Sequence, residues 1–126
     1  MRLLLDTVAF IWAATSPERI SRRAMNELTA PSAIREISTI SLSEIAIKAS
    51  RGKLAFSEDD VVQAIADLQL RVLPYTADHA LQLFTLPAHH ADPFDRQILA
   101  QALVEEIPIV TSDRSFRLYE GATILW

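Results

Sequence analysis

The chain has 126 residues, a formal net charge of -4 and no cysteine, and half of its residues are apolar. This length is enough for a hydrophobic core, so we expect residues 1–126 to form a single domain. No apolar run reaches the roughly 18 residues of a membrane-spanning helix, and the lack of cysteine excludes disulfides, thiolate nucleophiles and cysteine zinc sites. We therefore expect a cytoplasmic protein that does not enter a membrane.

The first half of the chain alternates apolar runs with helical patterns. Residues 3–5 form an apolar run that stops at Asp6, and a helix is predicted over 8–14 because a Ser-Pro pair follows it. Glu44 follows Ser41 at the spacing of a capping box, which predicts a helix that begins at Ser41. The other predictions here are a charged helix over 21–28, a strand over 36–40 and an end of the Ser41 helix at Gly52.

The second half continues the alternation. Ser57 and Asp60 form another capping-box pattern, and apolar residues at helical spacing follow it through Gln69. The Asp92-Pro93 pair is a strong helix start because proline suits the first turn. The remaining predictions are strands over 71–74, 107–111 and 122–125, a helix from Thr76, a loop over 86–91, and a short turn or helix over 113–116. This alternation predicts an α/β fold with a parallel sheet and helices on both faces.

Four acidic residues lie where a predicted strand ends or a predicted helix begins: Asp6, Glu44, Asp95 and Asp113. In a parallel α/β fold these points meet at the carboxyl edge of the sheet. Each acid alone has a structural explanation, as a helix cap, a first-turn acid or a turn residue. Independent caps need not share an edge, whereas the ligands of one ion must, so the four acids together predict a metal site. Carboxylate oxygens suit Mg2+ or Mn2+.

Other conspicuous features carry less functional information. There are only two glycines and no glycine-rich loop, so a Walker-type or dinucleotide-type phosphate site is not supported. His89 and His90 are adjacent, which makes them poor ligands for one shared ion, and the sequence favours a solvated loop for both. Arg96 follows Asp95 directly, and it could touch a substrate phosphate or pair with an acid.

Four segments carry a resemblance to a known family. They are LLLDT at residues 3–7, SLSEIAIK at 41–48, ADPFDRQILAQA at 91–102 and IVTSD at 109–113. In this order and at these separations they closely resemble the PIN-domain ribonuclease toxins of VapC type, over essentially the full length of the chain. The resemblance implies a PIN-like fold with a five-stranded parallel sheet flanked by helices on both faces. It also implies a Mg2+- or Mn2+-dependent endoribonuclease that serves as the toxin of a toxin-antitoxin pair.

Carried over by position, the resemblance gives catalytic roles to Asp6, Glu44, Asp95 and Asp113. Asp6 and Asp95 would be the central metal ligands, while Glu44 and Asp113 would bind the ion directly or through water. Asp92 would be a helix cap or a further ligand through water.

The resemblance also bears on Thr111 and on partners. The Thr111 hydroxyl would bind a ligand carboxylate or water, although an ordinary strand-end threonine fits the sequence equally well. The expected partners are an RNA substrate, a cognate antitoxin protein that occupies the active-site groove, and a second copy of the chain in a homodimer.

Two other functions remain as alternatives. One is a catalytically inactive PIN-like module that binds RNA or protein, although the presence of all four acids argues against a degenerate site. The other is a phospho-acceptor receiver-like domain, which also gathers acids at strand ends. A receiver domain needs a lysine after the last strands, and no lysine follows Lys53.

Overall fold

The computed structural model describes residues 1–126 and contains a five-stranded sheet in the order β3-β2-β1-β4-β5. All neighbouring strands are parallel. The strands are β1 (Arg2–Leu5), β2 (Ile34–Ser38), β3 (Arg71–Leu73), β4 (Ile109–Val110) and β5 (Ile124–Leu125). The predicted five-stranded parallel sheet is therefore confirmed.

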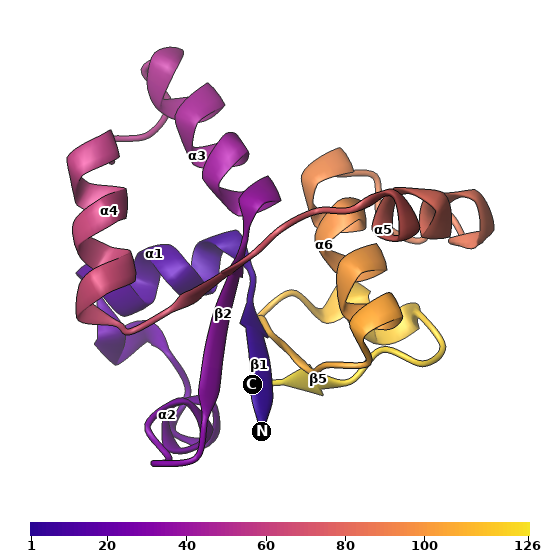
Figure 1. Ribbon diagram of the computed structural model, residues 1–126, viewed down its shortest axis with the longest axis horizontal. Helices are drawn as coiled ribbons and strands as arrows, with labels where there is room; N and C mark the ends of the chain where they lie inside the picture. The colour runs from indigo at the N-terminus through magenta and orange to yellow at the C-terminus, as the bar shows by residue number, and fades with distance from the viewer.

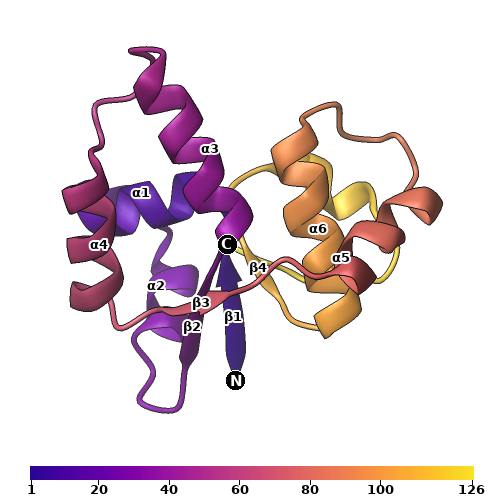
Figure 2. The ribbon, with the colours of Figure 1, turned by 45° about the horizontal axis from the view of Figure 1, so that its top comes forward.

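Helices cover both faces of this sheet, as predicted. Figures 1 and 2 show α1 to α4 on one side of the central strands and α5 and α6 on the other. The α-helices are α1 (Thr7–Thr15), α2 (Arg22–Leu28), α3 (Thr39–Ser50), α4 (Glu58–Asp67), α5 (Ala77–Gln82) and α6 (Pro93–Glu105). Short 3-10 turns cover Pro17–Arg19, Leu83–Thr85 and Arg114–Leu118. None of the helices has both the length and the apolar character needed to cross a membrane.

The core forms two hydrophobic clusters, one on each face of the sheet. Leu3 and Leu5 of β1 belong to the cluster under α1 to α4, whereas Leu4 belongs to the cluster under α6. All three leucines are at most 1% exposed. A central parallel strand is buried on both faces, which is why β1 is an unbroken apolar run rather than an alternating one. The end of this run fixes the position of Asp6.

The boundary between β2 and α3 differs from the sequence prediction. The strand covers Ile34–Ser38 rather than 36–40, and the side chain of Ser38 accepts a hydrogen bond from the Ile40 amide at 3.0 Å. Ser38 is therefore the N-cap of α3, and the prediction that Ser41 caps this helix is wrong. Both serines can cap, and the pairing of β2 with β1 selects the earlier one. Glu44 is then in the second turn, pointing inward.

The other helix boundaries follow the expected signals closely. Ser57 and Asp60 form the predicted capping box of α4, and the Asp92 side chain caps α6 by accepting hydrogen bonds from the Phe94 and Asp95 amides. The strands β4 and β5 contain only two residues each, so they are shorter than the predicted 107–111 and 122–125. Although β4 is short, both of its residues pair with the buried centre of β1 and so continue the sheet.

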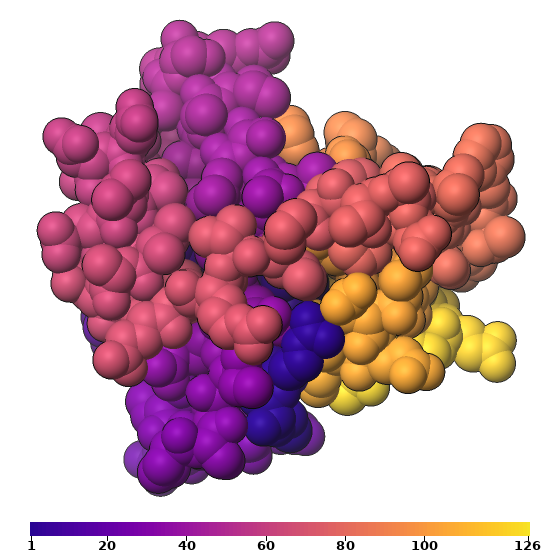
Figure 3. Space-filling view, in the orientation of Figure 1, coloured from indigo at the N-terminus to yellow at the C-terminus, as the bar shows by residue number.

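A partly buried charge network ties the start of β1 to its neighbours. The Arg2 guanidinium contacts Glu36 at 2.8 Å and Glu105 at 3.1 Å, and His79 Nε2 lies 3.1 Å from Glu105 Oε2. In the space-filling view, the amino-terminal residues in indigo reach the surface beside the orange segment that contains α6 (Figure 3). These contacts join β1, β2, α5 and α6 at the amino end of β1, away from Asp6.

Candidate functional site

The sheet order places the candidate site between β1 and β4. The chain runs from β1 outward to β2 and β3, and later returns to add β4 and β5 on the other side of β1. Such a reversal leaves a crevice at the carboxyl ends of the two central strands. Leu5 is paired with Val110, so the next residues, Asp6 and Thr111, emerge side by side.

Asp6 is a buried carboxylate held by hydrogen bonds on both oxygens. Its Oδ1 accepts from the Ala9 amide at 2.7 Å and thereby caps α1, while its Oδ2 accepts from the Thr111 hydroxyl. The residue is only 5% exposed. Burial raises the pKa of Asp6 to about 6, and the charges of Asp113 and Glu44 raise it further, against the two hydrogen bonds that lower it.

Glu44 approaches the site from α3 and is also buried. Its Oε1 accepts from the Thr7 hydroxyl at 2.6 Å, and its Oε2 pairs with the Lys48 ammonium one helical turn later. The hydroxyl of Ser41, the residue expected to cap the helix, instead lies 2.9 Å from Thr7 Oγ1 inside this cluster. The hydrogen bond to Glu44 raises the pKa of Lys48, so this ammonium is a fixed positive charge beside the acids.

Asp95 lies in the first turn of α6, directly after the Asp92 cap. Burial raises the pKa of Asp95 to about 7, and the charges of Asp92, Asp6 and Glu44 add to this increase. A carboxyl with a pKa raised this far retains a protonated population at neutral pH. One oxygen of Asp92 is engaged by the helix amides, which supports the interpretation of Asp92 as a cap.

Asp113 follows β4 and is the most exposed of the four acids, at 39% of its side chain. Burial alone would raise its pKa, but hydrogen bonds from the Ser115 hydroxyl and amide and from His90 outweigh it, so the pKa of Asp113 is lowered. The Asp113 amide donates to Thr111 Oγ1 at 3.0 Å. Thr111 therefore links Asp6 and Asp113.

His90 is the residue at this site that the sequence interpretation missed. Its Nε2 lies 2.9 Å from Asp113 Oδ2 and 3.2 Å from Asp95 Oδ2, and its side chain is only 13% exposed. One ligand atom from each of these three residues lies within 4.8 Å of the other two. The prediction of a solvated loop holds for His89 but is wrong for His90. The sequence signal that could have indicated a place for His90 near Asp95 is the Asp92-Pro93 helix start. The residues just before a helix cap lie close to the first turn of that helix.

Arg96 does not face the acids. Its guanidinium donates to the main-chain carbonyls of Leu86 and Pro87, at 3.3 and 2.9 Å. These bonds fasten the loop that carries His90 to α6. The sequence suggested that Arg96 touches a substrate phosphate or pairs with an acid, and these contacts with main-chain carbonyls are neither.

A family comparison agrees with this geometry. The model of the PIN domain matches residues 3–122. The chain belongs to the PIN domain family. The match extends from β1 to just before β5 and so includes every acid described above.

Solved structures show the same PIN-domain fold at low sequence identity. VapBC2 from Rickettsia felis, bound to a DNA fragment from its promoter, is 20% identical with a TM-score of 0.76, covering 98% of this chain and 97% of that one. DNA-bound VapBC from Salmonella typhimurium is 23% identical with a TM-score of 0.73, covering 98% and 96%. A toxin-antitoxin complex from Klebsiella pneumoniae is 20% identical with a TM-score of 0.65, covering 96% and 95%. No curated protein sequence matches the chain significantly.

The donor set of this PIN domain fits a hard divalent cation. Four carboxylates converge from β1, α3, α6 and the end of β4, and the pKa values of Asp6 and Asp95 are raised to about 6 and about 7. Repulsion and burial therefore oppose full ionisation, and a bound cation relieves both. Asp6 and Asp95 are the two of these acids whose pKa values are raised.

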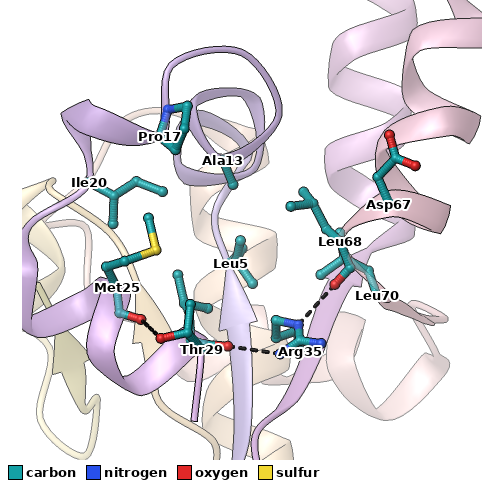
Figure 4. Close-up of a pocket in the computed structure, with 11 residues that line it drawn as sticks. Leu5, Ala13, Pro17, Ile20, Met25, Thr29, Arg35, Asp67, Leu68 and Leu70 are labelled. Carbon is teal, nitrogen blue, oxygen red and sulfur yellow. Dashed lines mark hydrogen bonds between the residues drawn. The ribbon is translucent and has the colours of Figure 1, made fainter. Parts of the chain in front are cut away.

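The acids of this PIN domain lie apart from its apolar hollows. None of the surface cavities is lined by Asp6, Glu44, Asp95 or Asp113. A cavity of about 240 Å³ between α1, α2 and the end of α4 is lined mainly by apolar side chains, including Leu5 and Met25 (Figure 4). Arg35 at its wall is engaged by the carbonyls of Leu68 and Leu28, at 2.9 and 2.8 Å. The acidic site is thus separate from these apolar cavities.

Proposed function

We propose that this PIN domain is a metal-dependent endoribonuclease that acts as the toxin of a toxin-antitoxin pair. The observation that carries the proposal is the convergence of Asp6, Glu44, Asp95 and Asp113 at the paired ends of β1 and β4, with the pKa of Asp6 and of Asp95 raised. The side chains of Asp95 and Asp113 are 23% and 39% exposed, so a polymer can reach the acids from this side.

In this proposal Asp6 and Asp95 hold Mg2+ or Mn2+, and Glu44 and Asp113 bind it directly or through water. A divalent cation at such a site activates water and stabilises negative charge on phosphoryl oxygens. The protein supplies fixed ligands, because Asp6 is held by Ala9 and Thr111. Asp92 is committed to capping α6 and contributes mainly its charge.

The proposed reaction is hydrolysis without a protein nucleophile. The oxygen of a water molecule attacks phosphorus in line while the bond from phosphorus to O3′ breaks. One proton of the water is taken up by the carboxylate cluster, and the leaving oxygen is protonated to a 3′-hydroxyl. The products are a 5′-phosphate and a 3′-hydroxyl. Pre-placed charges at the attacked phosphate are the main source of acceleration in such a site.

The proposed protein partner is an antitoxin. Support comes from the similar structures, which are VapBC or toxin-antitoxin complexes. The partly exposed carboxylates of Asp95 and Asp113 suit a basic side chain of a partner, which would compete with the cation. A homodimer is the further proposed assembly, supported by large apolar side chains that the single chain leaves in solvent, such as Phe84 at 88% exposure and Leu81 at 59%.

The proposal is tested with purified chain, free of other proteins, and a pool of single-stranded RNA oligonucleotides. We expect cleavage that requires Mg2+ or Mn2+, stops in EDTA, and leaves 5′-phosphate ends. Asp95→Asn should abolish it, whereas Asp59→Asn, an exposed acid on α4, should leave it unchanged. Tight binding of Mn2+ or RNA by the wild type without cleavage under any of these conditions would favour a binding module instead.

A further inference from the structure

His90 uses both ring nitrogens within the candidate site. Nδ1 lies 3.1 Å from the Asp92 amide nitrogen and accepts its proton, while Nε2 faces Asp113 Oδ2 and Asp95 Oδ2 at 2.9 and 3.2 Å. A nitrogen that accepts a hydrogen bond carries no proton. The ring proton is therefore on Nε2, and that N–H donates to Asp113 Oδ2 with Asp95 Oδ2 close beside it.

The ring is held in this orientation by its surroundings. It packs against Phe116 with ring centroids 5.4 Å apart, and the His90 amide donates to the Tyr119 hydroxyl at 2.7 Å. Arg96 fastens the same loop through the carbonyls of Leu86 and Pro87. His90 can therefore present its N–H without further ordering when a cation or substrate arrives.

This tautomer decides between two roles for His90. Direct coordination through Nε2 would require the ring proton to move to Nδ1, where it would oppose the Asp92 N–H at 3.1 Å. Donation to the carboxylates needs no such change. The donor role also leaves Oδ1 of Asp95 outside the contact with His90 and available to a cation.

We propose that His90 is a positioning residue whose Nε2–H holds Asp95 and Asp113 in place for a cation bound by carboxylate oxygens. The inference rests on the proposed metal-dependent function and adds an expectation about which divalent ions the site selects. Because no imidazole nitrogen is offered to the ion, the site should gain less affinity on going from Mn2+ to Zn2+ or Ni2+ than a site with a histidine ligand would. His90 also reduces the repulsion between the two acids before the cation binds.

The matched variants are His90→Gln and His90→Asn. The glutamine amide nitrogen can reach the position of Nε2 and donate there, whereas the asparagine amide reaches only the position of Nδ1. By calorimetric titration with Mn2+, without RNA, His90→Asn should weaken binding about 10-fold or more, as loss of a residue that orients a ligand does. His90→Gln should recover most of this loss, and His89→Asn should have no effect. Equal Mn2+ affinity in wild type and His90→Asn, or no Mn2+ binding by wild type, would overturn the proposal.

The tautomer is measured independently with long-range ¹H–¹⁵N spectra of the imidazole nitrogens. We expect His90 to carry its proton on Nε2 both in the metal-free protein and after saturation with Mg2+. A proton on Nδ1 after saturation, or a Zn2+ affinity that falls much more than the Mn2+ affinity in His90→Gln, would make His90 a direct ligand. If His90→Asn weakens Mn2+ binding but the wild type cleaves no RNA, the nuclease proposal fails and the role of His90 stands.

Discussion

The Thr111 hydroxyl donates to Asp6 Oδ2 and accepts from the Asp113 amide, so one side chain links the ends of β1 and β4. Thr111 is 1% exposed and cannot replace these partners with water. Of the two roles that the sequence left open for this residue, the structure shows the contact with a carboxylate.

Replacing Thr111 with valine keeps the shape and removes the hydroxyl. We expect a loss of about 1–3 kcal/mol in the free energy of unfolding, because the Asp6 oxygen and the Asp113 amide lose their partner. The hydrogen bond from Thr111 lowers the pKa of Asp6, so its loss should raise that pKa further and weaken Mn2+ binding. Urea denaturation and Mn2+ titration measure the two effects. Thr111→Ser is the control, and a serine variant as unstable as the valine variant would contradict this explanation.

The raised pKa values of Asp6 and Asp95 predict a metal-free protein that becomes more stable as the pH falls. Both values, about 6 and about 7, lie above the ordinary 3.8, so folding favours the protonated forms. Their stabilising effect is complete below about pH 4 and is lost as the pH rises through 6 to 7. For Asp95, which keeps some contact with solvent, the effect should be roughly 2–3 kcal/mol.

The variant Asp95→Asn isolates this contribution. In EDTA it should be more stable than wild type at pH 8 and similar to it at pH 4, because the amide never ionises. Denaturation across this pH range measures the difference. Parallel pH profiles for wild type and Asp95→Asn would show that the Asp95 pKa is not raised.

Cation binding should offset the repulsion between the acids and so raise the free energy of unfolding. With Mn2+ at 100 times its Kd, the wild type should gain about 2.7 kcal/mol of stability. Asp6→Asn should lose this gain, while Asp59→Asn should keep it. Thermal unfolding with and without Mn2+ measures the effect, and an equal gain in Asp6→Asn would remove Asp6 from the ligands.

The charge network at the start of β1 should affect stability but not the acidic site. Arg2→Met leaves Glu36, which is 1% exposed, as a buried charge without its partner. We expect a loss of about 2–3 kcal/mol, less than for a fully buried pair because a third of the Arg2 side chain remains in solvent. The double variant Arg2→Met/Glu36→Gln should recover much of this loss, and Mn2+ affinity should be unchanged in both.

Local signals in the sequence predicted the parts of the site that lie on single elements. The apolar run of β1 located Asp6, and the Asp92-Pro93 start located Asp95, because burial and capping act over a few residues. Contacts between distant segments were not predictable in the same way. The choice of Ser38 over Ser41 as the cap of α3 depends on strand pairing, and the position of His90 depends on Phe116, Tyr119 and Asp113.

The pairing of β1 with β4 also determines when during synthesis the site can form. Asp6 and Thr111 are 105 residues apart in the chain, and β1 has no β4 beside it until residues 109–110 are available. A nascent chain whose residues 109–113 are still inside the exit tunnel therefore has Asp6 but lacks Thr111 and Asp113 beside it. The acidic site, and with it the proposed nuclease activity, is thus absent from a nascent chain until residues 109–113 have emerged.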